Sequence, residues 1–283
     1  MTDTLAPKPV PAPRDATPAA AWRLLHESAC APYRRSGRFA WHFARGKLGR
    51  DPVFRGMLER GDLPAHAHVV DIGCGQGLLA SLLDAVHALH AQGRWPSQWP
   101  AAPIDAHYTG IELMPRDVGR AEAALAGLAR RPQFICGDMR QVPLPACDAV
   151  VILDVLHYVD HAAQAALLAR AHAALATGGR LLLRVGDAAQ SRGYAVSQWV
   201  DRIVTLVRGH RVPPTFGRPL AQWIALLEDI GFSVRSVPMS QGTPFANVLL
   251  VADKALALPC PSHRSCWTAR ASWRASRTRA AWR

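Results

Sequence analysis

The segment Val69–Leu79, with the sequence VVDIGCGQGLL, constrains the fold more than any other part of the chain. An apolar run ends in an acid, three alternating glycines follow, and a second apolar run begins. Glycines let a backbone turn sharply and lie close to a ligand, and the first turn of a helix offers free N–H groups. The segment therefore predicts a strand, a ligand-binding loop and a helix. A G-x-G-x-G pattern alone also occurs in ordinary turns, so the neighbouring segments must support this interpretation.

The rest of the chain alternates between strand-like and helical patterns. We expect strands at 68–72, 108–113, 133–136, 149–153 and 180–185, and helices at 78–89, 118–128 and 162–176. Two further helices are expected, at about 199–207 and at 220–227, and then strands at 232–237 and 247–251 that can pair antiparallel. Strands that alternate with helices predict an α/β fold with a doubly wound, mostly parallel sheet.

Four acids stand at or just past the ends of successive predicted strands: Asp71, Glu112, Asp138 and Asp154. In an open parallel sheet, ligands bind outside the carboxyl ends of the strands, so these side chains should converge. Glu112 suits the two hydroxyls of a ribose. Asp138 can accept a hydrogen bond from an adenine amino group, with Met139 against the ring. Each acid alone could be a helix cap, but four together favour a nucleotide site.

These motifs resemble those of the class I S-adenosylmethionine-dependent methyltransferases. The similarity covers about residues 65–253 and rests on V-D-I-G-C-G-x-G, on Glu112, on G-D-M and on L-D-V-L-H-Y. It implies a Rossmann-like sheet of seven strands with an antiparallel last strand, and S-adenosylmethionine as the cofactor. The cofactor residues that it implies are Asp71, Gly73, Cys74, Gly75, Gly77, Glu112, Leu113, Asp138, Met139 and Asp154.

A dinucleotide-binding site of the G-x-G-x-x-G type agrees less well with the sequence. Leu78 occupies the position where that motif has its third glycine. Glu112 also lies farther along the chain than the roughly 20 residues expected for a ribose-binding acid. That alternative gives Asp138 no role.

The run Leu153–Tyr158 bears on the methyl acceptor. It lacks the Asn/Asp-Pro-Pro-aromatic run typical of enzymes that methylate exocyclic amines, and it lacks the Pro-Cys pair typical of cytosine-C5 methyltransferases. The run instead resembles that of the small-molecule branch of the family. His157 is the candidate general base for a phenol, hydroxyl or carboxylic acid, and a packing residue is the alternative. Candidate substrate-pocket residues are Tyr33, His42, Tyr158 and Arg184.

A narrower resemblance involves R-V-G-D at 184–187, the helix around Trp199 and the run P-F-A-N-V-L-L-V-A at 244–252. These are similar to methyltransferases encoded with bacterial aryl polyene and related pigment pathways. That similarity implies a small-molecule or acyl-carrier-bound acceptor, methylated on oxygen or on an aryl carbon.

The net charge of +12 is confined to the two ends of the chain. Residues 1–50 carry a net +6, residues 260–283 another +6, and residues 51–259 a net of zero. A neutral body argues against nucleic acid as the substrate, although an RNA methyltransferase that uses basic ends is an alternative. An inactive methyltransferase fold that binds a partner is another.

The predicted organisation has four parts. Residues 1–20 are a disordered leader, 21–64 an N-terminal helical lid, 65–255 the methyltransferase domain, and 256–283 a basic unstructured tail. No apolar run is long enough to cross a bilayer and no signal peptide is evident, so we expect a cytoplasmic protein. None of the six cysteines forms a C-x-x-C pair, so no metal is expected, and Cys74, Cys136 and Cys147 should be buried thiols.

Overall fold

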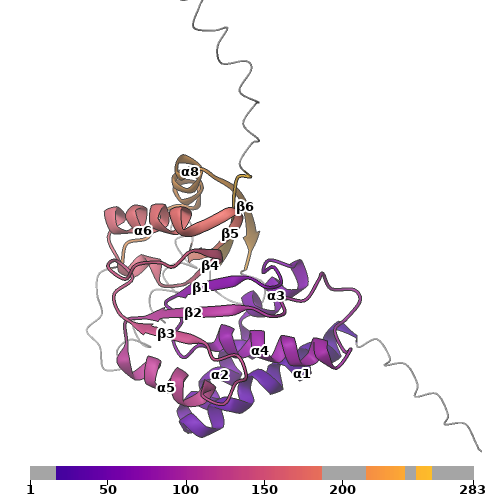
Figure 1. Ribbon diagram of the computed structural model, residues 1–283. Helices are drawn as coiled ribbons and strands as arrows, with labels where there is room; N and C mark the ends of the chain where they lie inside the picture. The colour runs from indigo at the N-terminus through magenta and orange to yellow at the C-terminus, as the bar shows by residue number, and fades with distance from the viewer. Residues whose placement is uncertain (1–16, 187–214, 240–246, 257–283) are drawn as a thin grey trace, which may run out of the picture.

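The computed structural model describes residues 17–186, 215–239 and 247–256, and its centre is a seven-stranded sheet (Figure 1). The strands are β1 (His68–Ile72), β2 (His107–Glu112), β3 (Gln133–Cys136), β4 (Cys147–Leu153), β5 (Leu175–Gly186), β6 (Phe232–Pro238) and β7 (Asn247–Lys254). Their order is β3-β2-β1-β4-β5-β7-β6. The pairs from β3 to β5 are parallel, and β7 is antiparallel to both β5 and β6.

Helices cover both faces of the sheet, with α6 and α8 on one face and α4, α5 and the N-terminal helices on the other (Figure 1). The helices are α1 (Pro18–Cys30), η1 (Ala31–Ser36), α2 (Arg38–Arg50), α3 (Pro52–Arg60), α4 (Leu78–Ala91), α5 (Pro115–Leu125), η2 (Leu156–Tyr158), α6 (His161–Ala174) and α8 (Leu220–Ile230). None of these helices is both long and apolar enough to span a membrane.

Alternate residues of the central strands supply two separate hydrophobic cores. Val69 of β1 and Val151 of β4 join the core beneath α1–α4. Val70, which follows Val69, and Val150, which precedes Val151, join the core beneath α6 and α8. Both sets are fully buried, which explains why residues 149–153 of β4 form an unbroken apolar run in the sequence.

Local sequence signals set the boundaries of the N-terminal helices. Thr17 caps α1 by accepting a hydrogen bond from the N–H of Ala20 at 3.3 Å. Asp51 caps α3 by accepting one from Val53 at 3.0 Å, with Pro52 at the first helical position. Gly61, in the left-handed conformation, ends α3.

The predicted α/β fold is confirmed, including the antiparallel last strand, and observed boundaries differ from the predicted ones by only a few residues over most elements. The helix expected at about 199–207 lies outside the described residues. One expectation was wrong: Cys136 is exposed, because it ends the four-residue edge strand β3. Cys74 and Cys147 are buried, as expected.

Candidate functional site

The glycine loop follows β1 at the carboxyl edge of the sheet. Gly73, Gly75 and Gly77 all have positive φ, at 76°, 55° and 72°. A Cβ at Gly73 would lie 2.5 Å from Val155, so this glycine permits a close approach between the loop and the chain after β4. A Cβ at Gly75 would meet nothing within 4 Å. The loop is therefore closely packed at Gly73 and faces open space at Gly75.

Glu112, at the end of β2, is held by two backbone donors. The N–H of Gly75 donates to one carboxylate oxygen at 2.9 Å, and the N–H of Met114 donates to the other at 2.9 Å. These bonds join the ends of β1 and β2 and fix the carboxylate beside the open side of the glycine loop. Each oxygen keeps a further lone pair that can accept from a ligand hydroxyl.

Asp71 lies inside β1, almost fully buried, and accepts a hydrogen bond from the hydroxyl of Tyr108 at 2.6 Å. Burial raises the pKa of this carboxyl to about 7, the Tyr108 bond opposes the rise, and the charge of Glu112 adds to it. Asp71 is therefore only partly ionised near neutral pH. Among the described residues, no group of three or more His, Cys, Asp or Glu side chains is arranged to hold a metal ion.

The segment after β3 carries Asp138 and Met139. Asp138 pairs with Arg140, with the closest contact at 2.5 Å, and the hydrogen bonds from Arg140 lower the pKa of its carboxyl. Met139 is partly buried against the core below α6. Leu113, directly after Glu112, leaves 60% of its surface exposed, so it offers an apolar surface beside the candidate ribose-binding carboxylate.

The N-terminal helical region contacts the glycine loop directly. The hydroxyl of Tyr33, on η1, donates to the backbone carbonyl of Gln76 at 2.8 Å, and Tyr33 is fully buried. The side-chain amide of Gln76 is also buried, and neither of its polar atoms has a hydrogen-bond partner among the described residues. Tyr33 is thus placed as support for the loop, and its predicted role in the substrate pocket remains a prediction.

A buried charge cluster joins α2 and α3 to the ends of β4 and β5. The guanidinium of Arg184 contacts Asp51 at 2.5 and 2.8 Å, and it also makes two contacts with Asp154, one of them at 2.7 Å. Lys47 reaches Asp51 at 2.8 Å and Asp154 at 3.4 Å. Arg184 is 2% exposed, and the two cations lower the pKa values of both carboxyls against the effect of burial.

This cluster changes how two predicted residues are understood. Arg184 directs its N–H groups at two carboxylates, and Asp154 adopts a left-handed conformation with φ at 60° while paired with Arg184 and Lys47. Their assignments to substrate and cofactor remain predictions. Asp51 already has a local role as the cap of α3, and nothing in the sequence near it indicates a partner 133 residues away.

His157 and Tyr158 lie on η2, the short turn after β4, with their ring centroids 4.1 Å apart. The backbone carbonyl of His157 accepts from the N–H of Phe216 at 2.8 Å. Burial lowers the pKa of the imidazole, and the nearby Asp154 partly opposes this. His157 is therefore neutral at physiological pH, the protonation state that a general base requires. His42, the remaining candidate, is exposed on α2 beside Trp41.

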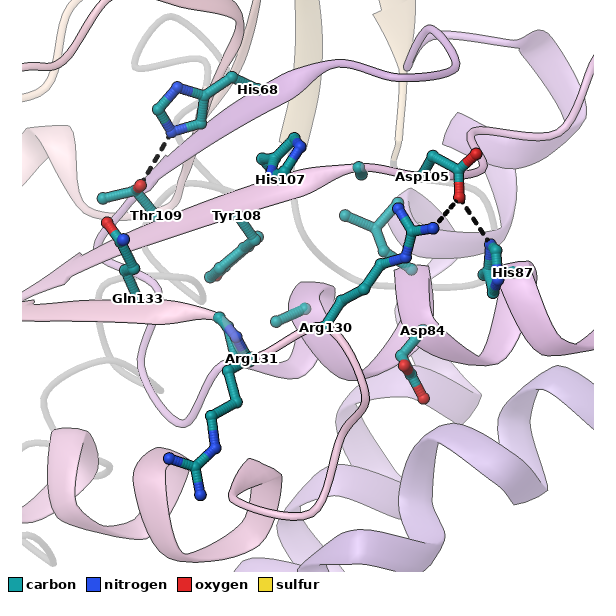
Figure 2. A pocket seen from close by; sticks show the side chains of 14 residues that line it. His68, Asp84, His87, Asp105, His107, Tyr108, Thr109, Arg130, Arg131 and Gln133 are labelled. Carbon is teal, nitrogen blue, oxygen red and sulfur yellow. Dashed lines mark hydrogen bonds and ion pairs between the residues drawn. The ribbon is translucent and has the colours of Figure 1, made fainter.

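A separate pocket of about 500 Å³ lies at the opposite edge of the sheet, around the first residues of β1, β2 and β3 (Figure 2). Asp105 of this lining contacts His87 at 3.2 Å and also contacts Arg130, and it reaches His66 outside the lining at 3.3 Å. Arg131 donates to the carbonyl of Ala126 at 3.2 Å. No sequence motif indicated this pocket, and none of the predicted site residues lines it.

Comparison with known proteins assigns the chain to a family. Residues 40–237 match the model described as a methyltransferase domain. The tetracenomycin polyketide synthesis 8-O-methyl transferase of Streptomyces glaucescens is 30% identical over 207 residues, which cover 70% of this chain and 55% of that protein. The chain thus spans about half the length of this curated relative.

Solved structures share the fold. Magnesium protoporphyrin IX methyltransferase from Synechocystis PCC 6803, with bound SAH, is 20% identical, with a TM-score of 0.51 over 84% of this chain and 100% of that one. An O-methyltransferase family protein from Burkholderia thailandensis is 18% identical, with a TM-score of 0.53 over 80% of this chain and 63% of that one. With the family model matched from within α2 to within β6, the chain belongs to the methyltransferase-domain family.

Proposed function

We propose that the chain is an S-adenosylmethionine-dependent O-methyltransferase that acts on a small molecule bearing a phenol or another acidic hydroxyl. The observation that carries this proposal is the open side of Gly75 next to the fixed carboxylate of Glu112. The family supports methyl transfer, and a relative named for 8-O-methylation in polyketide synthesis supports an oxygen acceptor.

The residues around the loop suit this cofactor. A backbone with no Cβ and with free space above it can lie against the methionine part of the ligand. Glu112 can accept from both ribose hydroxyls, Leu113 offers an apolar surface to the adenine, and Asp138 can accept from its amino group after releasing part of its contact with Arg140. The buried amide of Gln76 is a further polar group beside the loop. When bound, S-adenosylmethionine supplies an electrophilic methyl group.

The chain's own residues then orient the acceptor and receive its proton. A hydroxyl must lose its proton to become a good nucleophile, and a neutral imidazole can accept that proton. His157 follows β4 at the same edge of the sheet as the glycine loop, and its lowered pKa keeps it neutral. The main contribution to the rate of methyl transfer is the positioning of the hydroxyl oxygen in line with the methyl group, and proton removal by the base comes second.

Cofactor binding is tested by calorimetry with S-adenosylmethionine, S-adenosylhomocysteine and NAD. We expect the first two to bind and NAD to give no heat. Gly75→Ala should weaken S-adenosylhomocysteine binding, because the new methyl group would enter the open space above the loop. If this variant and the wild type bind S-adenosylhomocysteine equally well, the glycine loop is not part of the cofactor-binding site.

The acceptor is tested with methyl-labelled cofactor against phenols, hydroxybenzoates, fatty acids, acyl groups on a carrier protein, and tRNA. We propose transfer to the phenols, free or carrier-bound, as in pigment-type secondary metabolism. Labelling of tRNA alone would favour the RNA methyltransferase alternative. Binding of the cofactor with no transfer to any acceptor class would favour an inactive partner-binding fold.

A further inference from the structure

Helix α2 carries an aromatic stripe on one flank. Phe39 and Phe43 are one helical turn apart and their rings stack, with centroids 6.2 Å apart and planes 11° from parallel. Lys47 continues the stripe by another turn, and its ammonium group lies 3.4 Å from Asp154, at the end of β4. Residues at i, i+4 and i+8 share one side of a helix. The phenyl rings therefore lie on the same flank of α2 as Lys47, which contacts the end of β4.

The two ends of α2 are fixed on opposite sides of the glycine loop. Before its first turn, the hydroxyl of Ser36 donates to the carbonyl of Arg120 on α5 at 3.1 Å, and Arg120 lies 4.7 Å from the ring centroid of Phe39. After its last turn, Asp51 is bound to Arg184 of β5. Because β1 lies between β2 and β4 in the sheet, a helix tied to α5 and to β5 passes beside the loop that follows β1.

The polar end of this stripe has no net charge to offer a ligand. Lys47 and Arg184 supply two positive charges, and Asp51 and Asp154 supply two negative charges, all in mutual contact. The guanidinium beside the Phe39 ring belongs to Arg120, which is itself paired with Asp117 at 3.0 Å, and Phe39 leaves 49% of its surface exposed. An exposed ring stacked on a second ring, beside a neutral cluster, suits a flat aromatic ligand better than a charged one.

We propose that Phe39 and Phe43 form the wall that recognises the aromatic ring of the methyl acceptor. This inference rests on the proposed function and specifies its substrate class: a planar aromatic hydroxyl compound, selected over a saturated compound of similar size. The two residues determine specificity and take no part in proton transfer.

The test compares 2-naphthol with its saturated counterpart, decahydro-2-naphthol. Binding is measured by ligand-observed NMR titration, with and without S-adenosylhomocysteine. The variant Phe39→Leu/Phe43→Leu keeps apolar surface but removes both rings, so it should bind 2-naphthol about tenfold more weakly and bind the saturated compound within about twofold of wild type.

Trp41→Ala is the matched control on the same helix. Trp41 is two residues from both Phe39 and Phe43, which places it on the opposite flank of α2, and the guanidinium groups of Arg34 and Arg45 lie 5.6 and 5.0 Å from its ring centroid. Its replacement removes a larger ring, yet it should leave the preference for 2-naphthol unchanged. Thermal unfolding of all variants separates loss of the wall from loss of the fold.

The outcomes separate the two proposals. If wild type shows no preference for 2-naphthol, or if the leucine variant keeps that preference, the proposal of an aromatic wall is wrong. This holds whether or not S-adenosylhomocysteine binds. If S-adenosylhomocysteine does not bind but the preference depends on the two phenylalanines, the proposed function fails and the wall stands. If Trp41→Ala removes the preference equally, the effect belongs to the helix as a whole and the inference is wrong.

Discussion

Replacing Arg184 by methionine should destabilise the protein strongly. Arg184 is 2% exposed and its guanidinium contacts both Asp51 and Asp154. Methionine keeps the length and apolar character of the side chain but leaves two carboxylates with Lys47 as their remaining cation in the cluster. Removing one partner of a buried ion pair is costly mainly because the charge left behind stays buried.

The expected cost is about 3–5 kcal/mol, the range for breaking a buried pair. Asp51→Asn should cost less, about 1.5–3 kcal/mol, because Arg184 keeps Asp154 and because asparagine still caps α3. The exposed pair of Arg55 and Glu59, at 2.8 Å, provides the comparison, and Glu59→Gln should cost about 0.5 kcal/mol or less. At about 2–4 °C per kcal/mol, Arg184→Met should lower Tm by roughly 10 °C.

The pH dependence gives a second measurement. Asp51 has a lowered folded-state pKa, so its contribution to stability is present above the unfolded pKa and is lost as the pH falls through the folded value. Without Arg184 most of that contribution disappears. The difference between wild type and Arg184→Met should therefore be largest near pH 7 and shrink below about pH 4. Urea unfolding at pH 7 and in steps down to about pH 2 follows this change, because the loss continues down to the lowered folded-state pKa. A cost below about 1 kcal/mol at pH 7, as for a surface pair, would falsify the reasoning.

Three further predictions concern the site. Glu112→Ala should weaken S-adenosylhomocysteine binding by about 1–3 kcal/mol in calorimetry, since charge-assisted bonds to the ribose are lost; unchanged affinity contradicts the ribose assignment. His157→Ala should lower turnover about 10²–10⁴-fold with cofactor affinity unchanged. Wild-type turnover should fall with decreasing pH as the imidazole becomes protonated, at a pH below its ordinary pKa of about 6.5. If the His157→Ala variant keeps the wild-type turnover, His157 is not the general base. Gly73→Ala should unfold at a clearly lower temperature than wild type, because its Cβ would lie 2.5 Å from Val155. The control Gly119→Ala, where α5 faces open space, should stabilise the protein by up to about 1 kcal/mol. Equal melting temperatures of the two variants would contradict the close approach at Gly73.

The order of elements could be predicted from the sequence because each one has a local signal. Asp51-Pro52 marks the start of α3, and the glycines after Ile72 mark the end of β1. Alternating acids and glycines at successive strand ends also predicted that Asp71, Glu112 and Asp138 lie at one edge of the sheet. These signals lie within a few residues of the feature that they predict.

What the sequence did not predict depends on contacts between distant segments. Asp51 and Arg184 are 133 residues apart, and Asp51 has a sufficient local role as a cap, so the sequence offers no reason to pair them. For the same reason, the sequence suggested Arg184 as a substrate-pocket residue and did not indicate its contact with Asp51. The stacking of Phe39 on Phe43 is local, yet its significance depends on where α2 lies relative to β4, which Lys47 and Asp154 reveal only in three dimensions.

The place of β7 in the sheet has a consequence for synthesis on the ribosome. β7 lies between β5 and β6, so the last of the described strands to be translated is inserted between two earlier ones. Until Asn247–Lys254 leaves the exit tunnel, β5 has an unpaired edge along an apolar strand and β6 has no partner in the sheet. Unpaired edges of this kind invite association with other chains. Nascent chains that stall before residue 247 should therefore be the ones that depend most on chaperones, although they already carry β1, β2 and the whole glycine loop.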